Sequence, residues 1–247
     1  MTLDMSSFAG VQKFANALKA QFTSIDEAIL NAGTMQAKYV ASSDGWEETL
    51  QVNALSTFLL GILVLPLLIA SADAGTGSYT PHLTTFMASE TPLEDLSTQK
   101  HSPPGTFGGS TQYSRSKLVL EYAVRHLAAS PALKGADGQP KVIVNTPCPG
   151  FCKSGLRRQM SANAVVKFIG WLLYAIFART AEQGTNSYTP ALPGGVETHG
   201  EMWKNDRVYE PGPMYATEEG RKFGDRVWSE VSQVILKADP STEAFIG

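Results

Sequence analysis

Tyr113 and Lys117 stand four residues apart in the segment YSRSKL, 113–118. The pattern from about 113 to 129 predicts a helix, on which residues i and i+4 project from the same face. A free phenol has a pKa of about 10, and a nearby ammonium favours the phenolate and lowers that pKa. The pair therefore predicts a general acid/base. By itself it leaves open the alternative of a surface tyrosine and a surface lysine.

A long apolar segment precedes this pair and contains a second polar candidate. Residues 44–71 predict a helix that is polar at first and then apolar on all sides, as in a helix buried against a sheet or a partner. Its most apolar part, 54–70, is slightly short for a membrane span and contains Pro66, which favours a buried helix. The amide of Asn53 is costly in such a helix unless it is hydrogen-bonded.

Three short apolar or β-rich segments, 28–30, 82–89 and 141–147, alternate with the two predicted helices. The order strand, helix, strand, helix, strand predicts an α/β fold, a doubly wound parallel sheet. Ligands of such sheets bind beyond the carboxyl ends of the strands. Three separate segments are expected to meet there: Asn31, Ser89 and residues 146–151.

The remaining helices begin at residues suited to capping. Ser6 or Ser7 predicts the start of a first helix. Thr180 and Gln183 form the pattern of a capping box. Thr217, followed by two glutamates, predicts the start of an amphipathic helix near the end of the chain.

Composition limits the function classes. The chain has 247 residues, 43% of them hydrophobic and 17% charged, which is typical of one soluble α/β domain. A formal charge of −3 provides no basic field, so nucleic acid is not an expected partner. Cys148 and Cys152 are interpreted as reduced thiols, and the four histidines lack ligand spacing, so no metal is expected. No secretory signal opens the sequence, and we expect a cytoplasmic protein.

Six motifs, in order, resemble those of the short-chain dehydrogenase/reductase family: LDMSS, NAG, VNALSTFLL, HLTTFMASE, YSRSKL and PCPGF. The resemblance extends from Leu3 to about residue 236. Two later stretches, ARTAEQGTNSY and YEPGPMYATEEGRKFGDRVWSEV, resemble a fungal branch often encoded in secondary-metabolite gene clusters. The resemblance implies one Rossmann-like domain over residues 1–247. It also implies an NADP-dependent enzyme, with NAD as the other option, that interconverts a carbonyl and an alcohol on a fungal secondary metabolite.

The family's catalytic tetrad maps by resemblance onto Asn53, Ser89, Tyr113 and Lys117. Tyr113 would protonate the carbonyl oxygen, and Ser89 would orient that oxygen. Lys117 would lower the pKa of the tyrosine and bind the nicotinamide ribose. Asn53 would hold a water molecule in a proton relay.

The resemblance also implies cofactor contacts at the strand ends. Asp4 matches the acidic residue that contacts the adenine region. The other matching positions form a tight turn beside the cofactor and a Pro-Gly turn that flanks the nicotinamide: Asn31, Ala32, Gly33, Pro149 and Gly150.

Two local departures stand out. Ser89 precedes Tyr113 by 24 residues, a wider gap than the family's usual one, across a Pro-, Gly- and Ser-rich loop expected over 90–112. Ser110 is therefore an alternative hydroxyl. Leu30 occupies a position where many relatives carry a second asparagine.

A larger departure concerns the start of the fold. No G-x-x-x-G-x-G occurs near the start, and Gly75 and Gly77 form only a lone GxG after a helix. We expect the first βαβαβ portion to be missing, and the strand ending at Leu30 to expose an apolar edge. Three interpretations stay open: a fragment or short product of an ordinary reductase; a cofactor-independent isomerase, cyclase or dehydratase; and a catalytically inactive interaction protein.

Two segments raise the question of partners. Residues 157–178 predict a helix, and its apolar part, 168–177, fits core packing, a substrate lid or weak membrane contact. Segments 54–70 and 114–129 correspond to the helix pair through which family members commonly dimerise, so a homo-oligomer is a further hypothesis. The expected substrate is a small molecule.

Overall fold

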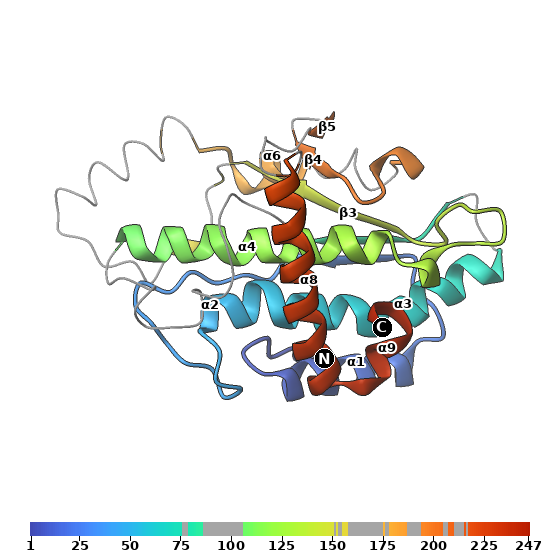
Figure 1. Ribbon diagram of the computed structural model, residues 1–247, viewed down its shortest axis with the longest axis horizontal. Coiled ribbons are helices and arrows are strands. Elements are labelled where there is room, and N and C mark those ends of the chain that lie inside the picture. Colours follow the sequence, from blue (N-terminus) through green and yellow to red (C-terminus); the bar gives the residue numbers. More distant parts are fainter. Residues whose placement is uncertain are drawn as a thin grey trace.

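The computed structural model describes residues 1–75, 79–85, 106–150, 152, 155–157, 175, 178–186, 194–204, 207–209, 215 and 217–247 (Figure 1). The strands are β1 (Glu27–Leu30), β2 (His82–Thr85), β3 (Ile143–Cys148), β4 (Met202–Lys204) and β5 (Arg207–Tyr209). The α-helices are α1 (Phe8–Gln21), α2 (Glu48–Leu50), α3 (Thr57–Ala74), α4 (Thr106–Ala128), α6 (Ala181–Asn186), α8 (Glu218–Ala238) and α9 (Glu243–Ile246). A π-helical turn, η1 (Gln51–Ser56), joins α2 to α3, and the short 3₁₀ turns are η3 (Pro131–Leu133), η4 (Gly155–Arg157), η5 (Val196–Thr198) and η6 (Pro240–Thr242).

The strands form one sheet in the order β1-β2-β3-β4-β5. The first four strands pair in parallel, and β5 is antiparallel to β4. This mostly parallel sheet with helical crossovers is a Rossmann-like α/β fold, as the order of segments predicted. The carboxyl ends of β1, β2 and β3 therefore lie along one edge of the sheet, next to the residues expected to carry the chemistry.

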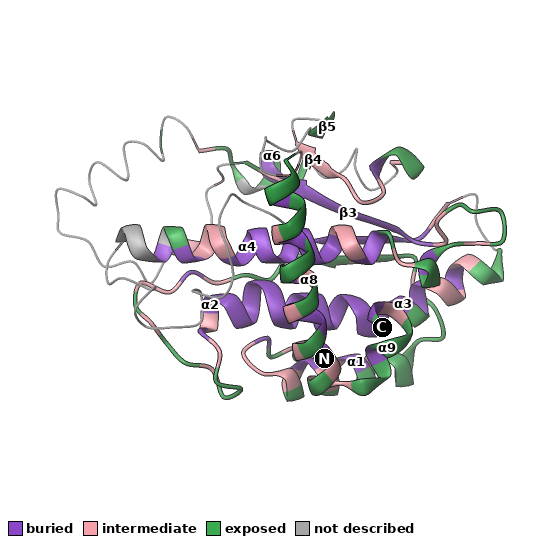
Figure 2. Ribbon diagram, in the orientation of Figure 1, coloured by how far each residue is buried: buried purple, intermediate pink, exposed green. Residues whose placement is uncertain are grey.

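The core lies between the sheet and two helices, α3 and α4, that lie side by side against it (Figures 1 and 2). Nearly all of α3 is buried, including Leu59, Leu65 and Leu68. By length and composition the helix from Glu48 to Ala74 could cross a membrane, but 83% of its apolar window is buried inside the fold. It is the core helix that the sequence predicted.

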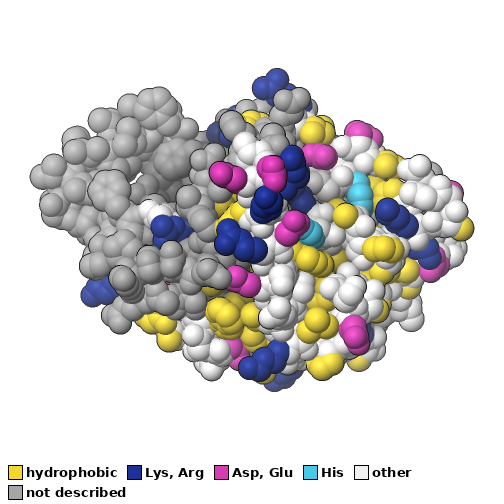
Figure 3. Space-filling model, in the orientation of Figure 1, with side chains coloured by type: hydrophobic (Ala, Val, Ile, Leu, Met, Phe, Trp, Pro, Cys, Tyr) yellow, Lys and Arg dark blue, Asp and Glu magenta, His cyan; other side chains and the backbone are white. Residues whose placement is uncertain are grey.

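Helix α8 crosses both core helices from outside (Figure 1). The ring of Trp228 packs edge-on against Phe58 at 5.9 Å and is stacked on His126 at 5.3 Å. The predicted oligomer surface, 54–70 with 114–129, is thus covered in part by the chain's own α8. On the face where α8 lies, acidic and basic side chains are interspersed, with no single-sign field in the described part (Figure 3).

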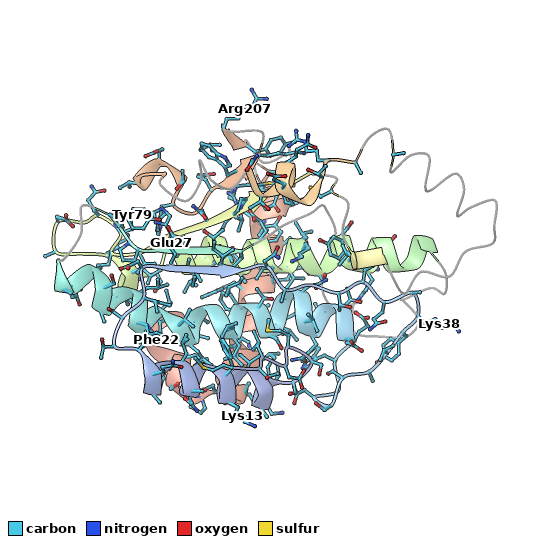
Figure 4. All side chains as sticks on the ribbon, turned by 180° about the vertical axis from the view of Figure 1, so that it is seen from behind. Lys13, Phe22, Glu27, Lys38, Tyr79 and Arg207 are labelled. Atoms are coloured by element: carbon cyan, nitrogen blue, oxygen red, sulfur yellow. The ribbon has the colours of Figure 1, made fainter. Side chains whose placement is uncertain are left out.

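The free side of β1 is exposed. Among the described residues β1 pairs only with β2, and Ile29 is 46% exposed. At the start of the strand the Tyr79 hydroxyl donates to Glu27 at 2.6 Å (Figure 4). The sequence predicted an apolar edge here; Ile29 is exposed as expected, but Leu30 is buried and the exposed Glu27 is charged.

Helix α4 begins at Thr106, seven residues before the predicted start, so 106–112 is helix and not loop. Tertiary packing explains the difference. A side chain at Gly109 would place its Cβ 2.6 Å from the Gln36 carbonyl oxygen, so glycine is needed where α4 crosses the chain after β1. Close packing here overrides the low helix propensity of glycine.

Candidate active site

Asn53 lies at the centre of the candidate site. The π-helical turn η1 places its fully buried amide against the segment that leaves β1. Its Oδ1 accepts the Thr34 N–H at 2.8 Å, and its Nδ2 donates to the Thr34 carbonyl at 2.9 Å and to Ser116 Oγ at 3.0 Å. The hydrogen bonding that the buried amide required is therefore present, and it fastens the segment after β1 to α4.

Lys117 brings a buried cation to the same place. Its side chain is 2% exposed, and burial lowers its pKa from 10.5 to about 8. Within the described residues its ammonium has no hydrogen-bond acceptor and no ion-pair partner. A Cβ added at Gly33 would stand 3.9 Å from Nζ and 3.2 Å from Asn53 Oδ1. The Lys117 ammonium thus lies close to the segment after β1, but this segment accepts no hydrogen bond from it.

Tyr113 lies beside Lys117, as the helical spacing predicted, with Nζ 5.9 Å from the centroid of the phenol ring. The predicted lowering of its pKa is wrong for this structure. Burial, and next the negative charge that Cys148 carries when ionised, raise the pKa of Tyr113 to about 12. Desolvation, which disfavours the charged phenolate, is the larger of these two causes.

Ser116 links these groups, although it was not among the predicted site residues. Its Oγ accepts from Asn53 and donates to the Tyr113 carbonyl at 2.8 Å. A hydroxyl between Tyr113 and Lys117 on the predicted helix was the available signal. Thr34 was also missed, because it acts through its backbone and no side-chain pattern marks such a role.

The predicted tight turn at Asn31, Ala32 and Gly33 does not form. Residues 31–36 continue from β1 without a turn, and all three predicted residues are exposed. Gly33 is needed for space rather than for a left-handed backbone, because its missing side chain lets the chain approach Asn53.

The end of β3 lies close enough to Tyr113 for the charge of Cys148 to act on it, and a loop follows there. Pro149 follows Cys148, the last residue of β3, and Gly150 has a φ of 74°, as a Pro-Gly turn requires. The Cys152 thiol donates back to the Pro149 carbonyl at 3.3 Å. Cys148 and Cys152 are both free thiols.

Asp4 stands just before α1. Its Oδ1 accepts the Ser6 N–H at 2.9 Å and the Ser6 hydroxyl at 2.7 Å, and these bonds lower the pKa of Asp4. The carboxylate thus shapes its own turn, and its predicted contact with adenine stays a prediction.

Several predicted residues are placed only partly. Ser89 lies outside the described residues, and for Ser110 only the helical backbone of α4 is described. The apolar segment 168–177 also lies outside them, apart from Ala175. Across the described ranges, no group of three His, Cys, Asp or Glu side chains could hold a metal ion.

Comparison with known proteins agrees with this geometry. A family model for short chain dehydrogenases matches residues 1–78. The short-chain dehydrogenase/reductase phmF of Phaeosphaeria nodorum is 34% identical over 250 residues, covering 99% of this chain and 72% of that protein. For ffsI of Aspergillus flavipes the identity is 34% over 252 residues, with coverage of 100% and 72%. The chain belongs to the short-chain dehydrogenase/reductase family, a family of oxidoreductases.

Solved structures support the fold. An uncharacterised protein from Mycobacterium paratuberculosis superposes with a TM-score of 0.61 at 19% identity, covering 94% of this chain and 74% of the other. RhlG of Pseudomonas aeruginosa, in a complex with NADP, gives 0.56 at 24% identity, with coverage of 83% and 74%. An NADPH-bound carbonyl reductase from chicken fatty liver gives 0.56 at 16% identity, with coverage of 85% and 75%.

Proposed function

We propose that this chain is an NADP(H)-linked reductase that interconverts a carbonyl and an alcohol on a small fungal metabolite. One observation carries the proposal: the buried Lys117 ammonium, without an acceptor among the described residues, faces the segment after β1 beside Tyr113. A buried cation without acceptors is unfavourable unless a ligand supplies them.

The residues present fit the ribose end of a nicotinamide dinucleotide. Ribose hydroxyl oxygens would accept from the Lys117 ammonium, and the absence of a side chain at Gly33 leaves the backbone close to Asn53. When bound, the cofactor supplies or accepts a hydride. Asn53 and Ser116 hold α4 and the segment after β1 in fixed relation, so the ammonium and the phenol keep one geometry.

Tyr113 is the proposed proton donor. With a pKa of about 12 its hydroxyl stays protonated at neutral pH, which suits donation to a carbonyl oxygen during reduction. Acceptors bound at Lys117 would favour the ammonium and strengthen its field at the phenol oxygen. The Ser89 hydroxyl is proposed to orient the substrate oxygen.

The finer assignments rest on resemblance and on relatives. Two structural neighbours were solved with NADP or NADPH, and the relatives phmF and ffsI come from fungi. We propose NADP with Asp4, Asn31, Ala32, Pro149 and Gly150 as further contacts, and a cytoplasmic location.

The test is turnover of an aromatic 1,2-diketone with NADPH, followed by loss of NADPH absorbance. Tyr113→Phe should lower kcat by about 10²–10⁴-fold, the usual contribution of a general acid. Equal rates in wild type and Tyr113→Phe would contradict the assignment. Turnover that needs no nicotinamide, yet is abolished by Tyr113→Phe, would instead identify a cofactor-independent isomerase or dehydratase.

A further inference from the structure

Glu47 is a buried carboxylate that is not among the residues predicted to be catalytic or to bind the cofactor. It is 1% exposed and caps the short helix α2, where its Oε2 accepts the Leu50 N–H at 2.9 Å. The same oxygen accepts the side-chain amide of Gln112, also at 2.9 Å. Glu47 thus connects the start of the α2–α3 helix to α4, across 65 residues of sequence.

Gln112 is the residue immediately before Tyr113 and is itself 3% exposed. Ser116, which bonds to Asn53, lies four residues after Gln112 and so on the same face of α4. Two hydrogen bonds therefore fasten this face of α4 to the α2–α3 helix. Tyr113 lies between the two attachment points and Lys117 directly after the second, so both depend on how this helical turn is held.

We propose that Glu47 is a positioning residue: by accepting the Gln112 amide, its carboxylate sets the rotation and height of the α4 turn that carries Tyr113. This inference rests on the proposed function. Glu47 does not touch the reacting atoms. It acts through α4, and a displacement of about 1 Å at a reacting group can cost up to about 10²-fold in rate.

The chemistry of the contact requires an acceptor at position 47. Both groups that meet Oε2 are donors, and a carboxylate oxygen can accept from both, so one oxygen serves both. A glutamine at 47 could place its amide oxygen where Oε2 lies and keep both bonds. Glu47→Met, with an unbranched side chain of similar length, would remove the acceptor from both donors, and α4 would lose this attachment.

Two variants at position 47 provide the test. Glu47→Met should lower kcat by about tenfold, with the KM for NADPH and for the diketone changed less than about twofold. Glu47→Gln keeps an oxygen that can accept from both Leu50 and Gln112, so it should retain most of kcat. Glu48→Gln is the matched control, because Glu48 bonds to the Gln36 amide at 2.9 Å, and it should leave kcat unchanged.

Amide hydrogen exchange separates positioning from activity. The α4 amides from 109 to 117 should exchange faster in Glu47→Met than in wild type, and at close to the wild-type rate in Glu47→Gln. An unchanged kcat in Glu47→Met, or a Glu47→Gln variant as slow as Glu47→Met, would overturn the proposal. If wild type shows no NADPH-dependent turnover, the proposed function fails, and unchanged exchange in Glu47→Met would then separately overturn the role of Glu47.

Discussion

Replacing Lys117 with methionine should stabilise the fold while removing activity. In the native protein burial lowers the pKa of Lys117 from 10.5 to about 8. A difference of one pKa unit corresponds to about 1.4 kcal/mol, so keeping Lys117 charged in the folded state costs about 3 kcal/mol at neutral pH. Methionine has a similar unbranched stem and no charge, so Lys117→Met should raise the free energy of unfolding by up to about 3 kcal/mol.

The pH dependence of this gain follows from the sign of the shift. Because the native pKa is the lower one, the native state releases the proton before the unfolded state does. The gap between variant and wild type should therefore be largest below about pH 8 and shrink as the pH rises toward 10.5.

Urea unfolding at pH 7 and at pH 9.5 measures both effects. Lys13→Met, on the exposed face of α1 (Figure 4), is the control and should change stability by less than about 0.5 kcal/mol. A Lys117→Met variant less stable than wild type at pH 7, or a gap that does not change with pH, would refute the reasoning.

Three further changes test other parts of the structure. The neutral ring of His199 accepts the Val144 N–H and donates to the Ala128 carbonyl, and burial lowers the pKa of His199. The free energy of unfolding, measured by urea titration, should therefore fall as the pH drops below about 6.5, and it should fall less in His199→Gln. Ile29→Lys, on the exposed strand β1, should reduce concentration-dependent light scattering, and equal scattering would argue against association through this edge. Thr217→Ala removes the hydroxyl that caps α8 at the Gly220 N–H and should cost about 1 kcal/mol in thermal unfolding; no change would show that this cap is dispensable.

The sequence predicted best what depends on neighbouring residues. Ser7 caps α1, Thr217 caps α8, and Thr180 and Gln183 exchange the two hydrogen bonds of a capping box before α6. Such caps are visible in sequence because both partners lie within three residues. The order of strands and helices was predictable for the same reason, from apolar periodicity along the chain.

What was missed depends on contacts between distant segments. Asn53 bonds to Thr34 and Ser116, the latter 63 residues away, and no local pattern reports such a pairing. The early start of α4 requires Gly109 to meet Gln36. The pKa of Tyr113 was predicted in the wrong direction because helical spacing shows the lysine but not the burial.

The central claim is that the buried Lys117 ammonium binds a nicotinamide dinucleotide. Calorimetric titration of NADPH into wild type and into Lys117→Met tests it most directly. We expect saturable binding by wild type and an affinity about 10- to 100-fold lower in the variant. This loss corresponds to the contribution of about 1.5–3 kcal/mol that a hydrogen bond to a charged group makes. Absence of binding by wild type, or equal affinity in the two proteins, would contradict the account.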